Sequence, residues 1–183
     1  TIAVGQRQWA TMNPLAQMRS PITMEDYHNS RWIIEPLHLL DCCLVSNGAV
    51  AVIVSSAAAA REMPQPPVYV WGMGQGHPGD NSRTGSNWET ETGAKLAAKT
   101  AYGMAGVGPS DISSCQVYDC YTYTVLVTLE DYGFCKKGEG GPFVEDGATV
   151  RVTWPKPFLV PSWAPAGGAP AGFSMGSGAL HAF

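Results

Sequence analysis

The hydrophobic positions along the chain fall into short continuous runs and into stretches with helical spacing. Residues 49 to 54 form an unbroken apolar run rich in valine and isoleucine, which predicts a strand buried on both faces. Ser55 or Ser56 can cap a short helix over residues 57 to 62, and residues 68 to 73 predict a strand after a proline-rich break. Strand, helix and strand in this order indicate an α/β fold.

The middle of the chain continues this pattern. Residues 72 to 85 predict a glycine-rich polar loop, and residues 91 to 102 predict a helix with a largely alanine apolar face. A turn at Pro109-Ser110-Asp111 then leads to a strand over residues 115 to 118. At the other end of the chain, residues 1 to 21 lack clear periodicity. Thr23 and Asp26 predict a capping box for a helix over residues 24 to 31, which Pro36 ends.

A second helix is expected directly after the strand at 115 to 118. Asp119 is a candidate N-cap and Gly133 a candidate C-terminal stop. The apolar positions between them recur at 3.6-residue spacing: Val125, Leu126, Leu129 and Tyr132. Many residues here are β-branched and favour a strand by propensity, so the helix requires support from tertiary contacts. A strand that ends where a helix begins can stabilise a thioester or an oxyanion through backbone N–H groups.

From residue 149 onward the pattern stops. Five prolines lie among alanine, glycine, serine and tryptophan, with Arg151 and Lys156 as the only charged residues. We expect neither helix nor strand and poor order over residues 149 to 183. We interpret this tail as a truncated or frame-shifted translation, which reading the coding DNA in its other two frames would test.

Composition and charge exclude several classes of function. The formal net charge is −4, charged residues make up 14% and no basic run is present, so we expect neither nucleic acid nor an anionic membrane as a partner. The five cysteines have no C-x-x-C spacing, and no signal sequence is recognisable. We therefore expect a cytoplasmic protein. No apolar stretch is long enough to cross a bilayer.

The segment Tyr118-Asp119-Cys120-Tyr121 and the run from 129 to 141 resemble the thiolase superfamily. The resemblance is to lipid-transfer-protein or sterol-carrier-protein type thiolases and to steroid side-chain aldolases. Ordinary thiolases have Asn-Glu-Ala-Phe at this segment, the sterol-carrier branch has His-Asp-Cys-Phe, and the first residue points into the active site. Tyr118 holds that place here, as in steroid side-chain aldolases and phloroglucinol acetyltransferases.

A second passage carries the same resemblance. Residues 21 to 26 and 35 to 52 are similar to the family's passage from its loop domain into the first C-terminal strand. Cys43 and Leu44 stand where thiolases have Ser-Gly, and Asn47 replaces an aspartate. The resemblance spans about residues 1 to 147. It implies an incomplete thiolase-like α/β C-terminal domain with a mixed five-stranded sheet and helices on both faces. Its implied divisions are the end of a loop domain (1–40), a partial C-terminal domain (41–148) and the tail (149–183).

The resemblance also implies a function. It favours retro-aldol cleavage of a β-hydroxyacyl-CoA of steroid side-chain type, with acyl transfer or non-catalytic lipid or acyl-CoA binding as alternatives. Tyr118 and Asp119 are the candidate catalytic residues, and Cys43, Leu44 and Cys120 the candidate CoA contacts. The CoA thioester is the substrate, and no metal or other cofactor is implied. Implied partners are a second copy and a small OB-fold acyl-CoA-binding protein. Because the family's nucleophilic cysteine lies outside this sequence, we expect the chain alone to be inactive.

Each candidate also has a simpler interpretation. As a catalytic group, Tyr118 can protonate an oxyanion or, with a lowered pKa, remove a hydroxyl proton. In the simpler interpretation it is a strand-end phenol whose hydroxyl only finds a hydrogen-bond partner. Asp119 can be only a helix cap. Cys120, placed just inside the helix, can be a small buried hydrophobe, and Cys42 with Cys43 can be packing residues. We interpret His77 as a loop histidine, and the glycines around it lack the spacing and the Lys-Ser/Thr of a phosphate loop.

Overall fold

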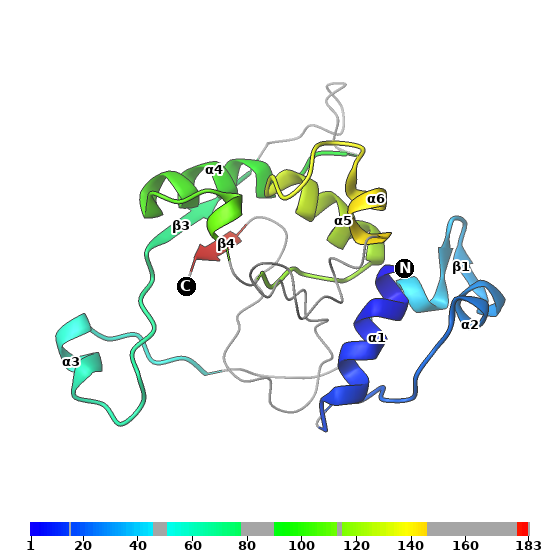
Figure 1. Cartoon of the computed structure of the whole chain (residues 1–183), viewed down its shortest axis with the longest axis horizontal. Coiled ribbons are helices and arrows are strands. Elements are labelled where there is room, and N and C mark those ends of the chain that lie inside the picture. Colours follow the sequence, from blue (N-terminus) through cyan, green and yellow to red (C-terminus); the bar gives the residue numbers. More distant parts are fainter. Residues whose placement is uncertain (15, 46–50, 78–89, 113–114, 146–178, 183) are drawn as a thin grey trace.

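The computed structural model of the chain describes residues 1–14, 16–45, 51–77, 90–112, 115–145 and 179–182. The helices are α1 (Ile2–Met12), α2 (Met24–Asn29), α3 (Ala57–Arg61), α4 (Ala94–Ala105), α5 (Thr122–Asp131) and α6 (Gly140–Glu145). The strands are β1 (Trp32–Ile34), β2 (Leu37–His38), β3 (Gly72–Gln75) and β4 (Ala179–Ala182), and 3₁₀ turns cover Leu39–Asp41 and Pro109–Asp111. Helix α3 lies at one end of the molecule, and α2 with β1 at the other (Figure 1).

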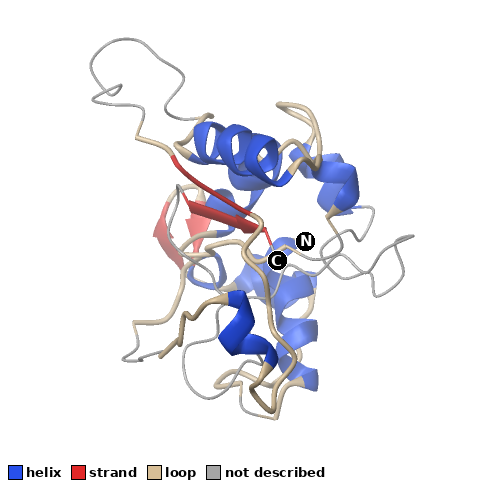
Figure 2. Ribbon diagram, turned by 90° about the vertical axis from the view of Figure 1, so that its left-hand side faces the viewer, coloured by secondary structure: helices blue, strands red, loops and turns tan. Residues whose placement is uncertain are grey.

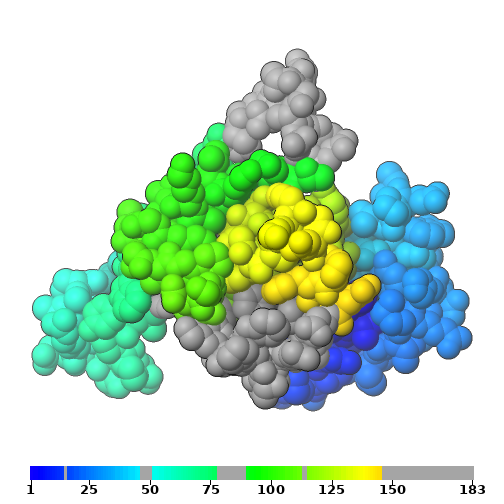
Figure 3. All heavy atoms as spheres, turned by 45° about the horizontal axis from the view of Figure 1, so that its top comes forward, coloured from blue at the N-terminus to red at the C-terminus, as the bar shows by residue number. Residues whose placement is uncertain are grey.

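The core lies where α4, α5 and α6 meet the start of α1. Its buried members are Ile2, Ala94, Ala98, Ala101, Cys115, Val117, Val125, Leu129, Tyr132 and Val144. Figure 3 shows the region after α5, in yellow, between the green surface of α4 and the blue N-terminal region. Leu129, Val117 and Val125 are the largest fully buried side chains. Because Val117 is fixed in this core, the residue after it is held at the edge of the core.

Strand β3 packs directly against α4, as Figure 2 shows. The strand and the residue after it carry glycine at alternate positions, which face the helix: Gly72, Gly74 and Gly76. A Cβ atom at any of them would overlap a backbone carbonyl oxygen at the start or along the face of α4. The glycines therefore permit close approach of strand and helix. The prediction of a loop over residues 72 to 85 is wrong for Gly72–Gln75, and residues 78–85 lie outside the described residues.

We expect Gly74→Ala to lower the free energy of unfolding by about 1–3 kcal/mol, because the new methyl group would meet the Ala97 carbonyl and push strand and helix apart. The matched control is Gly103→Ala on α4, where a Cβ would meet nothing within 4 Å. That change should raise the free energy of unfolding by roughly 0.5–1 kcal/mol through helix propensity. Urea unfolding followed by circular dichroism checks both values. Equal effects of the two substitutions would contradict close strand–helix packing.

The strands in the described residues form two antiparallel pairs, β1 with β2 and β3 with β4. The strand predicted over residues 68–73 is confirmed only at Gly72 and Met73, which belong to β3. The predictions at 51–54 and 68–71 are wrong, because a strand needs a neighbour for its backbone hydrogen bonds and none is paired with these described segments. Their apolar side chains are exposed, with Val54 at 88%. Residues 49 and 50 lie outside the described residues, and the five-stranded sheet stays a prediction.

Strand β4 corrects the expectation for the tail. Gly72 lies opposite Ala182 and Gln75 opposite Ala179 in the antiparallel pair, so the tail contributes one strand. The strand forms where its backbone pairs along the whole length of β3. Residues 149–178 and 183, to which the same expectation applied, lie outside the described residues.

The short-range signals for helix boundaries are largely confirmed. Thr23 and Asp26 form the predicted capping box at the start of α2, and the Ser56 hydroxyl accepts from the Ala59 N–H at the start of α3. The predicted 91–102 helix is α4, shifted by three residues at each end. Pro36 does not end α2, which stops before Ser30, but lies in the turn between β1 and β2.

Helix α1 was not predicted. Its buried residues are Ile2, Ala3, Gly5 and Ala10, which are mostly too small to produce an apolar periodicity in the sequence. None of the helices in the described part of the chain is both long and apolar enough to span a membrane.

Candidate active site

The segment that carries Tyr118 is an edge of the core rather than a strand. Residues 115 to 118 alternate between buried and more exposed, with Val117 at 1% and Tyr118 at 39% exposure. The predicted strand is wrong because no described strand pairs with this segment. Its alternation nevertheless points the Tyr118 side chain outward while Val117 anchors the backbone.

Helix α5 begins later than predicted. Its N-cap is Tyr121, whose carbonyl oxygen accepts from the N–H of Thr124 at 3.0 Å, so Asp119 is not the cap and Cys120 lies just outside the helix. The physical reason is a tertiary contact, because Gln6 Nε2 on α1 donates to Asp119 Oδ2 at 3.3 Å. The predicted stop is confirmed, since Gly133 follows the C-cap residue with φ at +79°.

A second segment, distant in the sequence, pairs with the segment that carries Tyr118. Cys42 and Tyr121 form an antiparallel bridge, and the Cys43 N–H donates to the Cys120 carbonyl oxygen at 3.0 Å. The structure therefore brings together the segments that carry the five residues predicted for the site: Cys43, Leu44, Tyr118, Asp119 and Cys120. Leu44 continues the segment and is exposed at 42%. The roles of these residues stay predictions.

The surroundings of Tyr118 raise its pKa above the ordinary value of 10.0. The largest cause is the neighbouring Cys120, followed by partial burial and by Cys43, since each disfavours a phenolate. The interpretation in which a lowered pKa makes Tyr118 a base is therefore wrong in direction. The phenol remains protonated at neutral pH and can donate a hydrogen bond or a proton.

One buried carboxylate beside the site was missed by sequence reasoning. Asp41 is 6% exposed and accepts hydrogen bonds from Thr122 Oγ1 at 2.6 Å, Tyr27 OH at 2.8 Å and the His38 N–H at 2.7 Å. Burial and then the contact with Asp41 raise the pKa of Tyr27 to about 12. The available signal was a single acidic residue between two apolar pairs, Leu39-Leu40 and Cys42-Cys43, which indicates a buried, hydrogen-bonded carboxylate.

The thiols have different environments. Cys43 is exposed, Cys42, Cys120 and Cys135 are half-buried, and all five cysteines are free. Cys120 Sγ lies 3.2 Å from Thr124 Oγ1, and burial raises the pKa of Cys115 to about 12. His77 is an exposed loop residue 2.7 Å from the Gln75 amide, as predicted. Within the described residues, no group of three or more His, Cys, Asp or Glu side chains could hold a metal ion.

The sequence of this chain is similar to a protein-family model and to proteins of known activity. The family model Thiolase C-terminal domain-like matches residues 74–152. The chain is 44% identical over 151 residues to the steroid side-chain-cleaving aldolase of Thermomonospora curvata, covering 80% of this chain and 39% of that protein. It is 41% identical over 152 residues to the 17-hydroxy-3-oxo-4-pregnene-20-carboxyl-CoA lyase of Mycobacterium tuberculosis, again covering 80% and 39%.

A solved structure gives the same result for the fold. The chain superposes on the Ltp2-ChsH2(DUF35) aldolase with a TM-score of 0.73 and 36% identity, over 86% of this chain and 42% of that one. A thiolase-like α/β fold is therefore confirmed at this level. The chain spans about two fifths of the length of these relatives.

Proposed function

Because this chain is homologous to the C-terminal part of thiolase-superfamily proteins, with steroid side-chain-cleaving aldolases among its relatives, we propose that the full-length protein containing it is such an aldolase. Its substrate would be a β-hydroxyacyl-CoA with a steroid-like group at the β-carbon. The names of the two similar relatives, an aldolase and a CoA lyase, support this reaction and this thioester.

One observation carries the proposal. The hydrogen bond from the Cys43 N–H to the Cys120 carbonyl, at 3.0 Å, joins two distant segments beside an exposed phenol with a raised pKa. That arrangement places a protonated donor, Tyr118, at the edge of the core near the amino end of α5. A helix N-terminus favours the negative charge that develops on a thioester enolate.

The reaction assigns a distinct task to each group. A base takes the β-hydroxyl proton, the O–H electron pair forms a carbonyl, and the Cα–Cβ bond breaks. Its electron pair moves onto the acyl-CoA part as an enolate, which is then protonated at Cα. We assign to Tyr118 the hydrogen bond or proton donated to this enolate, because its raised pKa keeps it protonated. Because the Asp119 carboxylate accepts a hydrogen bond from Gln6 and anchors the segment on α1, we assign the removal of the β-hydroxyl proton to a base elsewhere in the full-length protein.

Several finer features belong to the same proposal. Cys43, Leu44 and Cys120 would contact the CoA thioester, which is a substrate rather than a cofactor. The exposed apolar segments at 51–54 and 68–71 would join a mixed five-stranded sheet in the full-length protein. The two components in the name of the solved aldolase support a second protein as partner, for which we propose a small OB-fold acyl-CoA-binding protein. We also propose a homodimer located in the bacterial cytoplasm.

The test is a product analysis in D₂O. The full-length protein, with any partner encoded beside it, is incubated with a CoA thioester whose β-carbon carries a hydroxyl group and lies in a ring. We expect a cyclic ketone and a shortened acyl-CoA in equal amounts, with one deuterium at Cα of the acyl-CoA, measured by mass spectrometry. Thiolysis of a β-ketoacyl-CoA by free CoA, with no ketone formed from the β-hydroxy substrate, would favour a thiolase instead. Tight binding without turnover would favour an acyl-CoA-binding subunit.

A further inference from the structure

We propose that Asp41 is a positioning residue for the candidate site. Its buried carboxylate holds the segment 38–43 against the first residue of α5 and thereby fixes the pairing of Cys43 with Cys120 beside Tyr118. The part of this proposal that concerns catalysis rests on the aldolase function proposed above, whereas the part that concerns geometry does not.

The contacts of Asp41 come from three separate elements. Oδ2 accepts from Tyr27 OH on α2 at 2.8 Å and from the His38 N–H of β2 at 2.7 Å. Oδ1 accepts from Thr122 Oγ1, at the first position of α5, at 2.6 Å. Both oxygens are therefore engaged, and one of the bonds joins residues 81 positions apart in the chain.

Burial makes this arrangement specific. A carboxylate that is only 6% exposed is costly unless donors surround it, so alternative placements that leave it unpaired are disfavoured. The position beside the first turn of α5 also favours its negative charge. Asp41 thus selects the arrangement in which Thr122, Tyr27 and the His38 backbone reach it together.

The placement of Asp41 affects the candidate site because the pairing of residues 42–43 with residues 120–121 begins at the next residue in the chain. Cys42, one position after Asp41, lies opposite Tyr121. The backbone N–H of Cys43, two positions after Asp41, donates a hydrogen bond to the Cys120 carbonyl oxygen. Cys43 and Cys120 are also among the groups that raise the pKa of Tyr118. A shift of the 38–43 segment would therefore change the immediate surroundings of the phenol.

The first experiment measures geometry without any substrate. Cys43 and Cys120 are the next positions after the opposed residues Cys42 and Tyr121, and a backbone hydrogen bond joins them at 3.0 Å. Facing residues of an antiparallel pair have Cβ atoms roughly 4.5–5.5 Å apart, close to the separation that a disulfide needs. Diamide, which takes two electrons and two protons from a pair of thiols, should therefore link Cys43 to Cys120 in this chain. The rate is followed by peptide mass spectrometry. We expect Asp41→Ala to lower this rate at least tenfold, and Thr122→Val, which removes one bond, to lower it severalfold.

Asp41→Asn separates position from charge. The amide oxygen can accept from Tyr27 and His38 while the amide nitrogen donates to the Thr122 hydroxyl, so the cross-linking rate should stay within about threefold of the wild type. Asp26→Ala is the control. Asp26 lies on the same helix as Tyr27, but its carboxylate accepts a hydrogen bond from the Thr23 N–H within the capping box of α2. It should loosen α2 without changing the cross-linking rate.

The second experiment uses the full-length protein and its kcat and KM. We expect Asp41→Ala to lower kcat about a hundredfold with KM changed less than threefold, because misplacing a reacting group by about an ångström has an effect of that size. Asp41→Asn should restore most of kcat. An unchanged cross-linking rate in folded Asp41→Ala and Thr122→Val would overturn the proposal, as would equal losses in Asp41→Asn and Asp41→Ala. A slowed cross-link in a protein that shows no aldolase activity would overturn only the proposed function.

Discussion

Replacing Tyr118 with phenylalanine should lower kcat for carbon–carbon cleavage by the full-length protein by about 10²–10⁴-fold, the usual contribution of a general acid or base. The substitution removes one hydroxyl group from a side chain that is 39% exposed, so the fold should keep its stability within about 0.5 kcal/mol. The lost rate would therefore report on chemistry. Because the effect arises in the transition state, KM should change much less than kcat.

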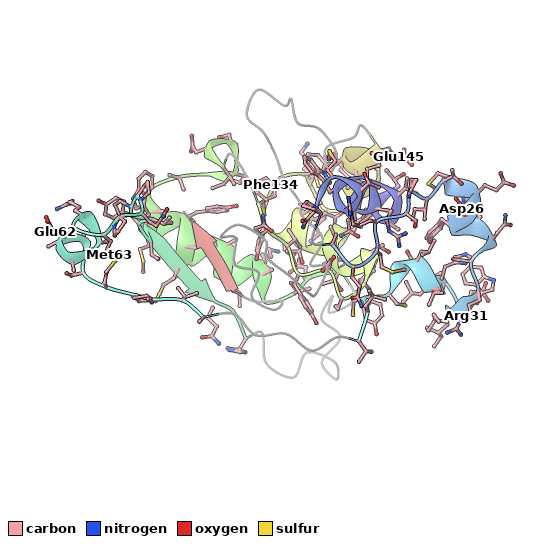
Figure 4. The ribbon with its side chains drawn as sticks, turned by 90° about the horizontal axis from the view of Figure 1, so that it is seen from below. Asp26, Arg31, Glu62, Met63, Phe134 and Glu145 are labelled. Carbon is pink, nitrogen blue, oxygen red and sulfur yellow. The ribbon has the colours of Figure 1, made fainter. Side chains whose placement is uncertain are left out.

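Tyr69→Phe is the matched control. Tyr69 is 40% exposed and its hydroxyl accepts from Arg61 Nε of α3 at 3.3 Å, away from the candidate site. Figure 4 shows Glu62 and Met63, the residues after α3, at the opposite end of the molecule from Asp26 and Arg31. This variant should retain wild-type kcat. Equal turnover in Tyr118→Phe and the wild type would exclude the phenol as the proton donor.

The pH dependence of the cleavage rate provides a second test of Tyr118 as the proton donor. A donor must be protonated, and the pKa of Tyr118 lies above 10.0, so the donor form dominates at all lower pH values. On the alkaline side, the rate should therefore fall as pH rises through that raised pKa. The Tyr118→Phe enzyme should lack this alkaline decrease, provided that both proteins remain folded in the same range.

The features predicted correctly from the sequence are those set by neighbouring residues. The Thr23–Asp26 capping box, the Ser56 cap and the Gly133 stop each depend on contacts within a few positions, which a sequence displays directly. Tyr118, Asp119 and Cys120 could be grouped for the same reason. Cys43 and Leu44 could be added only through the family resemblance, because they lie 74 to 77 positions before that group in the sequence.

The features that were missed depend on tertiary partners. Asp119 would cap α5 by local preference, but its carboxylate accepts a hydrogen bond from Gln6 of α1, and the helix starts two residues later than that cap would place it. Residues 51–54 have the composition of a strand, yet a strand forms only where a neighbour supplies hydrogen bonds. Asp41 gains its importance from Thr122 and Tyr27, which no short-range pattern connects to it.

The largest effect on stability should come from Lys137→Met, which we expect to lower the free energy of unfolding by about 3–5 kcal/mol. Helix α5 ends in two buried acids, with the side chains of Glu130 and Asp131 only 6% and 0% exposed. Lys137 Nζ lies 2.7 Å from Asp131 Oδ1 and 3.6 Å from Glu130 Oε2, and it also donates to the Thr90 carbonyl. Removing this cation leaves two buried negative charges side by side.

The hydrogen bonds that remain do not replace the ammonium group. Glu130 Oε1 accepts from the N–H groups of Gly138 and Gly140 at 3.0 and 2.9 Å, and Asp131 Oδ2 accepts twice from Thr92 at 2.8 Å. These donors are neutral and hold the carboxylates in place, so the charges would stay buried and repel each other. A second substitution, Asp131→Asn, should therefore recover part of the loss in the Lys137→Met background.

Lys95→Met provides the comparison that isolates burial. Lys95 also pairs with a carboxylate at 2.8 Å, Glu91, but their side chains are 54% and 37% exposed. An exposed pair four residues apart contributes only about 0.3–0.5 kcal/mol, so Lys95→Met should leave urea unfolding nearly unchanged. At roughly 2–4 °C per kcal/mol for a chain of this size, Lys137→Met should lower Tm by several degrees or more. If both variants unfolded at the same urea concentration, the contact between Lys137 and the two acids would not support this end of α5.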